Sequence, residues 1–267
     1  MAHSEGAPLG WLARGEGSIP SGEAWLHDRE RERLAAMCFT KRRNEYLVRR
    51  LAAKAAVASA LGLPEDVVAL GRIGVLNHPT GAPYVVVDGK APGLEVSLTD
   101  RAGWAVCLVG RDLGALGVDL EIVEPRSRGF VTDFLTEAEQ ATVAACAAAG
   151  PDGHDAAANL IWSAKESALK VLRVGLRADT RTVEVELADP AQVTPAASGG
   201  AGVWSALEVR TRVGVMPGWW RRDGIFLTTL VTQPGARLDP PLLLPGTADL
   251  ATAEPIYSWQ AHPVHEP

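Results

Sequence analysis

The chain has 267 residues, of which 47% are hydrophobic and 22% are charged, and its formal net charge is −6. This composition excludes a disordered or fibrous protein, and the length can bury one large core or two small ones. No apolar stretch approaches the length of a membrane span, and the N-terminus lacks the apolar core of a signal peptide, so we expect a cytoplasmic protein without membrane contact. The cysteines, Cys38, Cys107 and Cys146, lack metal-type spacing and are expected in the core.

The N-terminal part of the chain has helical composition over residues 28–62, as one long helix or two, and this region ends at Gly62 with Pro64 close behind. Within it, residues 29–54 hold nine Lys or Arg against three Glu. Such a run is typical of a solvated helix face, which composition alone favours, or of a docking surface for an acidic partner. We expect no nucleic acid as partner.

The rest of the chain alternates short strands with helices. Apolar runs bounded by Gly, Pro and Asp predict strands, and a capping-box pattern at Thr136 and Glu139 predicts the start of a helix. The predicted strands are 82–88, 94–100, 103–110, 116–123, 181–188, 203–213 and 224–232, and the predicted helices are 136–150 and 156–173. This order predicts an α+β protein of two similar halves that meet near residue 115, followed by an extended or disordered Pro-containing tail over 234–267.

Two acidic residues stand out in the strand "GVDLE" (117–121). Asp119 and Glu121 are two positions apart, so they share one face of a strand, where two unpaired carboxylates repel each other. In the helix "WSAKESALK" (162–170), one face combines a third carboxylate with hydroxyls and a cation, from Ser163, Glu166, Ser167 and Lys170. Three carboxylates beside a lysine suit Mg²⁺ and a phosphate group.

Each of these motifs also has an ordinary structural interpretation. An Asp-x-Glu strand is frequent by chance, and Glu166 with Lys170 is a common helix-surface ion pair worth a few tenths of a kcal/mol (~0.2–0.5). Their order and spacing favour the functional interpretation.

The combination of motifs resembles the 4′-phosphopantetheinyl transferases of the larger, two-halved kind. The segments that carry the resemblance are "GVDLE", "FLTEAE" (134–139) and "WSAKESALK", with "EYLVRRLAAKAAVASALGL" (45–63), "TGAPYV" (80–85) and "PGWWRRDGIFLTTLVT" (217–232). It covers about residues 20 to 232 and leaves out the tail.

The resemblance implies a monomer with a pseudo-twofold pair of similar halves, each a small antiparallel sheet packed with helices. The N-terminal half, 1–115, would hold the nucleotide of coenzyme A, and the C-terminal half, 116–233, would hold Mg²⁺ and the catalytic motifs; residues 234–267 form the tail. The implied reaction moves the phosphopantetheine arm of coenzyme A onto a serine of an acyl or peptidyl carrier protein. The acidic carrier is expected to dock near the basic N-terminal segment or the helix 136–149.

The resemblance also assigns roles to residues. The implied metal ligands are Asp119, Glu121 and Glu166, and the implied catalytic residues are Glu166, Lys170 and Glu139. The implied coenzyme A contacts are Arg43, Arg49, Arg50, Lys54, Ala82, Pro83, Thr99, Asp100, Lys165 and Lys170. Trp162 is expected to pack.

Two positions depart from the family pattern, because Asp100 replaces an expected histidine and Ala82 an expected basic residue. Both changes remove positive charge from the nucleotide side, and we expect nearby arginines, Arg43 and Arg49 first, to supply it. Two alternatives remain: a non-catalytic relative that binds a carrier protein or a nucleotide, and an unrelated Mg²⁺ phosphohydrolase.

Overall fold

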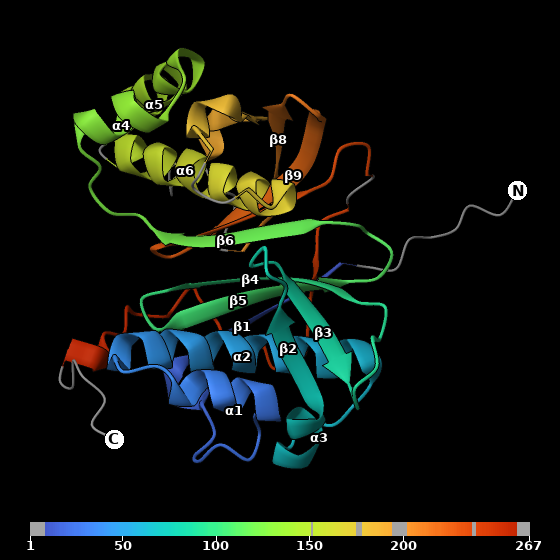
Figure 1. Cartoon of the computed structure of the whole chain (residues 1–267). Coiled ribbons are helices and arrows are strands. Elements are labelled where there is room, and N and C mark those ends of the chain that lie inside the picture. The colour runs from blue at the N-terminus through green and yellow to red at the C-terminus, as the bar shows by residue number, and fades with distance from the viewer. Residues whose placement is uncertain (1–8, 151, 175–177, 194–201, 237–238, 261–267) are drawn as a thin grey trace, which may run out of the picture. The chain divides into compact units, whose positions relative to one another are not determined.

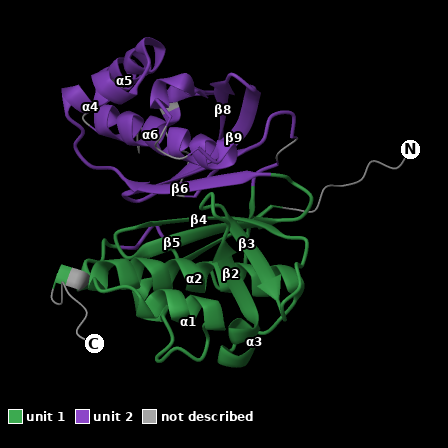
Figure 2. Cartoon of the chain, viewed as in Figure 1, with its two compact units in different colours: residues 1–114, 241–249, 254–267 green, residues 115–240, 250–253 purple. Residues whose placement is uncertain are grey.

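The computed structural model of the chain describes residues 9–150, 152–174, 178–193, 202–236 and 239–260. It is an α+β protein, as the sequence predicts, and its strands pair antiparallel except for β11, which lies parallel to β1 (Figure 1). The chain forms two compact units, each with its own hydrophobic core (Figure 2). Unit 1 comprises residues 1–114, 241–249 and 254–267, and unit 2 comprises residues 115–240 and 250–253. Of the helices in the described part, none has the length and apolarity that a bilayer crossing requires.

Unit 1 is a sheet covered by a long helix. Its helices are α1 (Asp28–Ala35), α2 (Thr40–Leu61) and α3 (Val67–Arg72), and its strands are β1 (Gly10–Gly15), β2 (Ile73–Asn77), β3 (Pro83–Val87), β4 (Glu95–Arg101), β5 (Trp104–Gly110) and β11 (Leu242–Leu243). The main sheet has the order β11-β1-β5-β4, and β2 pairs with β3 in a separate hairpin. Helix α2 packs on β1 and β5. Cys107 lies in this core, whereas Cys38 is exposed, so the core position predicted for Cys38 is wrong.

The predicted helical region 28–62 consists of two helices. The first begins at the N-cap His27, and the second ends at Gly62, whose left-handed conformation (φ 65°) suits a residue without Cβ. Strand β1 was missed, because its six residues are all buried and a strand covered on both faces shows no polar alternation.

Unit 2 repeats the theme of a long helix on an antiparallel sheet. Its helices are α4 (Arg128–Phe134), α5 (Glu137–Ala149) and α6 (Gly153–Leu172), and its strands are β6 (Leu116–Ile122), β7 (Glu184–Leu187), β8 (Ser205–Thr211), β9 (Gly214–Asp223) and β10 (Phe226–Thr232). The strand order is β6-β10-β9-β8-β7, antiparallel throughout. Figure 1 shows α6 running along β6, with α4 and α5 beside α6. Thr136 and Glu139 form the predicted capping box.

Helix α6 lies unusually close to β6 at Gly117. A Cβ atom on this residue would lie 1.9 Å from the backbone oxygen of Ser167, so a side chain would push the helix away. The close contact brings the polar face of α6 onto the acidic strand.

The tail continues the sheet of unit 1. The backbone N–H groups of Leu242, Leu244 and Ala248 donate to Leu9, Trp11 and Ala13 at 2.8, 3.0 and 3.0 Å, respectively. Residues 242–248 of the tail therefore run along the outer edge of β1, whereas residues 250–253 belong to unit 2 and Ser258–Gln260 form a short 3-10 helix.

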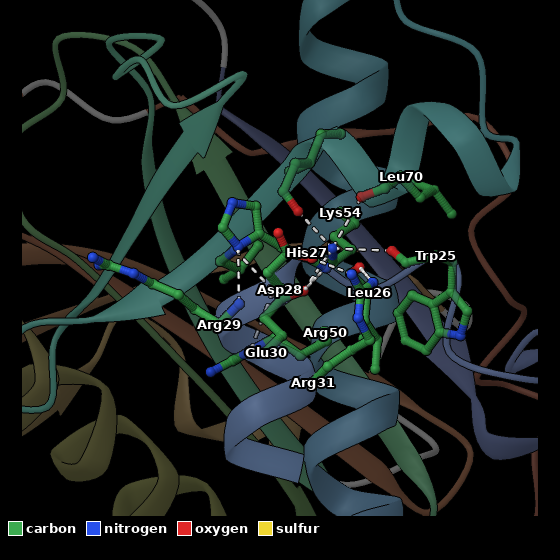
Figure 3. Close-up of polar contacts among 12 residues, drawn as sticks. Trp25, Leu26, His27, Asp28, Arg29, Glu30, Arg31, Arg50, Lys54 and Leu70 are labelled. Atoms are coloured by element: carbon green, nitrogen blue, oxygen red, sulfur yellow. Dashed lines mark hydrogen bonds and ion pairs between the residues drawn. The ribbon is translucent and has the colours of Figure 1, made fainter. Parts of the chain in front are cut away.

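A buried ion pair ties α1 to α2 in unit 1 (Figure 3). Lys54 Nζ lies 2.6 Å from Glu30 Oε2 and donates to the carbonyl oxygens of Trp25, Leu70 and Ile73. Glu30 also caps its own helix through the N–H of His27 and accepts the N–H of Val75 on β2 at 2.9 Å. Both side chains of the pair are fully buried.

Unit 2 contains the same device. Lys165 Nζ on α6 lies 2.8 Å from Glu139 Oε2 and donates to the carbonyl oxygens of Thr180 and Val183 at 3.0 and 2.6 Å. Glu139 caps α5 through the N–H of Thr136 at 2.7 Å, and it accepts the N–H of Val185 on β7 at 2.7 Å. Each unit thus joins a capping-box glutamate, a lysine of the long helix and the next strand in one buried cluster.

Candidate functional site

The acidic pair lies on the face of β6 that α6 covers. Asp119 is buried at 7% exposure and stands opposite Thr229 in the register between β6 and β10. Glu121 follows two residues later and is half-buried. The strand alternation thus directs both carboxylates the same way, as the sequence predicts.

Helix α6 supplies a donor to each oxygen of Asp119. Lys170 Nζ donates to Asp119 Oδ1 at 2.9 Å and to the carbonyl oxygen of Val118 at 2.6 Å. Ser163 Oγ donates to Asp119 Oδ2 at 2.9 Å. The predicted polar face of α6 is therefore the face that meets β6, and Asp119 is held by one cation and one hydroxyl.

Glu166 lies between these residues on α6 and is the carboxylate with the poorest compensation. Burial, with the neighbouring charges of Asp119 and Glu121, raises its pKa from 4.5 to about 7, although Lys170 acts in the opposite direction. Its Oε1 atom is buried and has no hydrogen-bond partner among the described residues. A buried acceptor in this state can receive a proton or a cation.

A cation that the sequence analysis missed lies beside Glu121. The guanidinium of Arg126 lies 3.6 Å from Glu121 Oε2, donates to Asn159 Oδ1 at 2.6 Å and stacks 4.6 Å from the ring centre of Phe130. In the sequence, Arg126 is visible only as a basic residue in the loop after the acidic strand. Its partners Asn159 and Phe130 lie on α6 and α4, and their contact with Arg126 depends on the fold.

The three carboxylates are the right type of ligand for a hard divalent cation, but they are not arranged as a complete coordination shell. Among residues of the described ranges, no group of three or more His, Cys, Asp or Glu side chains has a metal-binding arrangement. The donor set of Asp119, Glu121 and Glu166 is all oxygen, however, and Glu166 Oε1, which has no hydrogen-bond partner in the described part of the chain, offers an open ligand. Mg²⁺ takes few protein ligands and completes its shell with water and phosphate oxygens, so such a partial site suits it.

Glu139 and Lys165 form the buried cluster of unit 2. Both side chains are fully buried, and burial lowers the pKa of Lys165 while the charge of Glu139 raises it. The contacts of Lys165 account for its three N–H donors. These placements favour structural roles for both residues. The catalytic role of Glu139 and the phosphate-binding role of Lys165 stay predictions.

Trp162 packs against Phe130 and Phe134 of α4, with ring centres 5.3 Å apart in both pairs. It takes the packing position expected of it.

In unit 1, the structure pairs two of the predicted coenzyme A contacts with each other. Arg49 of α2 forms a hydrogen-bonded ion pair with Asp100 of β4, and the side chains are 31% and 13% exposed. The aspartate that replaces the expected histidine therefore meets a cation. Thr99, the neighbouring residue on β4, is buried.

The other cations predicted to contact coenzyme A, Arg43, Arg50 and Lys54, contact protein groups. Arg43 donates to the carbonyl oxygen of Leu34 at 2.6 Å, and Arg50 donates to Asn77 Oδ1 at 2.8 Å. Arg50 is buried at 4% exposure, and Lys54 belongs to the buried cluster with Glu30. Ala82 and Pro83 are half-buried at the end of the β2–β3 hairpin, where the carbonyl oxygen of Ala82 accepts the N–H of His78 at 2.9 Å.

Comparison with known proteins identifies the segment that holds the acidic cluster. Residues 115–210 match the sequence model of the 4′-phosphopantetheinyl transferase superfamily. Holo-[acyl-carrier-protein] synthase from Thermotoga maritima, a solved structure, matches with 22% identity over 48% of this chain and 74% of that chain, at a TM-score of 0.31. No curated protein matches the chain significantly. The matched residues run from β6 into β8 and contain Asp119, Glu121 and Glu166. The match over residues 115–210 confirms the predicted resemblance to the 4′-phosphopantetheinyl transferase superfamily.

Proposed function

We propose that the protein is a phosphopantetheinyl transferase of the larger, two-halved kind. It transfers the 4′-phosphopantetheine arm of coenzyme A to a serine of an acyl or peptidyl carrier protein and depends on Mg²⁺. The observation that carries the proposal is the cluster of Asp119, Glu121, Glu166 and Lys170, which lies inside the segment that matches the superfamily.

The reaction is a displacement at the pyrophosphate of coenzyme A. The serine oxygen of the carrier forms a bond to the phosphorus that bears pantetheine, and the bond from that phosphorus to the bridging oxygen breaks. The bridging oxygen leaves with 3′,5′-adenosine bisphosphate, and the serine proton passes to a base. We assign this task to Glu166, because its Oε1 atom is buried and has no hydrogen-bond partner among the described residues, so it can receive the proton.

The other residues of the cluster hold charge. Asp119, Glu121 and Glu166 would bind the metal ion, which supplies Lewis-acid stabilisation of negative charge on phosphate oxygens. Lys170 already lies 2.9 Å from Asp119, so its ammonium group can turn to a phosphate oxygen without leaving the cluster. In unit 1, Arg49 is a half-exposed cation that would contact the nucleotide phosphates, and its ion pair with Asp100 competes with that contact.

The test is an intact-mass measurement on an apo carrier protein. Wild-type protein, coenzyme A and Mg²⁺ should add the mass of one phosphopantetheine arm to the carrier, and a chelator or Asp119→Asn should prevent the addition. An unmodified carrier across a panel of acyl and peptidyl carriers would contradict the proposal. If the protein still bound carrier or nucleotide, the non-catalytic alternative would take its place.

A further inference from the structure

Behind Asp119 lies a chain of buried hydroxyl groups that the proposed chemistry does not use. Ser163 Oγ, which donates to Asp119, lies 2.9 Å from Thr229 Oγ1, and Thr229 Oγ1 lies 2.8 Å from Ser167 Oγ. Ser167 Oγ also donates to the carbonyl oxygen of Thr229 at 3.1 Å. The three hydroxyl residues are fully buried, and they come from α6 and from β10, the strand that pairs with β6.

The carboxylate of Asp119 fixes the direction of this chain. An ionised carboxylate only accepts, so the single proton of Ser163 is used toward Asp119, and Ser163 must accept from Thr229. Thr229 has then used its proton, so Ser167 divides its one proton between the carbonyl oxygen and Oγ1 of Thr229. Ser163 and Thr229 thus both donate toward Asp119, with Ser167 anchoring Thr229, and such aligned hydrogen bonds strengthen one another in a buried environment.

We propose that Ser163, Thr229 and Ser167 form a hydroxyl relay that positions Asp119 for metal binding. The relay holds Oδ2 through Ser163, and the half-exposed Lys170 holds Oδ1, so a metal ion can replace the lysine at Oδ1 while Oδ2 keeps its hydrogen bond. These are positioning residues, because they act through Asp119 and are not among the proposed metal ligands. The proposal rests on the proposed function for its consequence in catalysis, but its effect on metal affinity can be measured without transfer.

Strand β10 offers a matched set of variants. Thr229→Val keeps the shape of the side chain and removes the hydroxyl, whereas Thr229→Ser keeps the hydroxyl. Thr228→Val is the control, because Thr228 is the adjacent residue, is equally buried, and has an Oγ1 atom without a hydrogen-bond partner among the described residues. Circular dichroism and thermal unfolding check that each variant is folded, and Ser163→Ala tests the relay independently if Thr229→Val does not fold.

The primary readout is binding of Mn²⁺, a paramagnetic substitute for Mg²⁺, measured by electron paramagnetic resonance with the full chain. We expect Thr229→Val to bind Mn²⁺ roughly 10-fold more weakly than wild type, the usual loss on removing a group that orients a metal ligand. Thr229→Ser and Thr228→Val should bind like wild type. In the transfer assay, Thr229→Val should need more Mg²⁺ for half-maximal rate and reach nearly the same kcat at saturating Mg²⁺.

Equal Mn²⁺ affinity of Thr229→Val and wild type would overturn the relay, as would an equal loss in Thr228→Val or the absence of Mn²⁺ binding by wild type. If the variants differ in Mn²⁺ affinity as expected but no carrier is modified, the relay stands and the proposed transfer fails. The two proposals therefore fail separately.

Discussion

Asp119 and Glu166 show how neighbouring carboxylates acquire different chemistry from their contacts. Asp119 has Lys170 and Ser163 as donors, whereas Oε1 of Glu166 is buried without a partner among the described residues. Contrasting environments of this kind let one carboxylate serve as a fixed anion and the other exchange a proton. Glu166 is accordingly the residue whose titration should be visible in the stability of the protein.

We expect Glu166→Gln to stabilise the metal-free protein at high pH more than at low pH. The pKa of Glu166 is about 7 in the folded protein and near 4.5 when unfolded, so its protonated form is favoured by folding. The contribution of this group is therefore largest below about pH 4.5 and is lost as the pH rises through about 7. Gln stays neutral, so the difference in Tm between variant and wild type should grow from about pH 5 to about pH 8 in the presence of a chelator. A difference that stayed constant would show that Glu166 does not titrate in this range.

The ion pair of Arg49 and Asp100 makes a second prediction at this scale. Asp100→Asn should free Arg49 for the 3′-phosphate and lower the KM for coenzyme A, by up to about fivefold, because a partly exposed ion pair is worth at most ~1 kcal/mol. The kcat should change little, since the contact is made in both the ground and transition states.

Dephospho-coenzyme A, which lacks the 3′-phosphate, is the control substrate for this variant. Its KM should be the same for Asp100→Asn and wild type. Equal changes with both substrates would show that Arg49 does not meet the 3′-phosphate.

Among secondary-structure elements, the two buried Lys–Glu clusters explain how the long helices are fixed. In each unit, the glutamate caps a short helix and contacts the next strand, and the lysine joins both to the long helix. In unit 2, this cluster fixes Lys165, the residue directly before Glu166, and so sets the position of the acidic face of α6.

We expect Lys165→Met and Glu139→Gln each to destabilise the protein by roughly 3–5 kcal/mol, because each leaves an unpaired polar or charged group buried. The double variant should cost less than the sum of the two, since it leaves neither charge alone. Chemical denaturation measures these effects.

The control for these variants is the exposed ion pair of the same unit, between Glu186 and Arg210, whose side chains are 58% and 55% exposed. Arg210→Ala should leave the stability nearly unchanged, because an exposed ion pair contributes little. Strictly additive losses at Lys165 and Glu139 would refute a coupled pair.

The sequence predicted elements well where the signal was local. The capping box at Thr136, the end of α2 at Gly62 and the acidic face of β6 all depend on residues close together in the chain. It missed what depends on distant partners, because Arg126 is oriented by α4 and α6. The burial of Lys165 was also missed. A lysine on a helix is expected to be solvent-exposed unless a buried partner is known, and the partner, Glu139, lies on another helix.

At the scale of the whole molecule, the C-terminal segment completes unit 1. Besides its backbone hydrogen bonds to β1, the tail accepts two side-chain hydrogen bonds from unit 1. Arg14 donates to the carbonyl oxygen of Gly246, and Trp104 donates to the carbonyl oxygen of Glu254 at 2.7 Å. The tail thus covers an edge of β1 that would otherwise present unpaired backbone groups.

Deletion of residues 241–267 should therefore lower the Tm by at least ~5 °C, because several backbone hydrogen bonds worth ~1 kcal/mol each are lost and each kcal/mol shifts Tm by about 2–4 °C. The exposed edge of β1 should also promote aggregation, visible by light scattering. Deletion of residues 261–267 alone is the control, since it leaves the described bonds in place. A shorter chain as stable as the full one would show that the tail contributes nothing to unit 1.

The central claim is that coenzyme A is split and its arm is transferred, and one reaction can measure both products. With wild-type protein, Mg²⁺, coenzyme A and an apo carrier, the moles of carrier that gain the phosphopantetheine mass should equal the moles of 3′,5′-adenosine bisphosphate released. Equal amounts, with neither product formed by Glu166→Gln, are the result we expect. Release of the nucleotide without gain of mass on the carrier would identify a phosphohydrolase and contradict the proposed transfer.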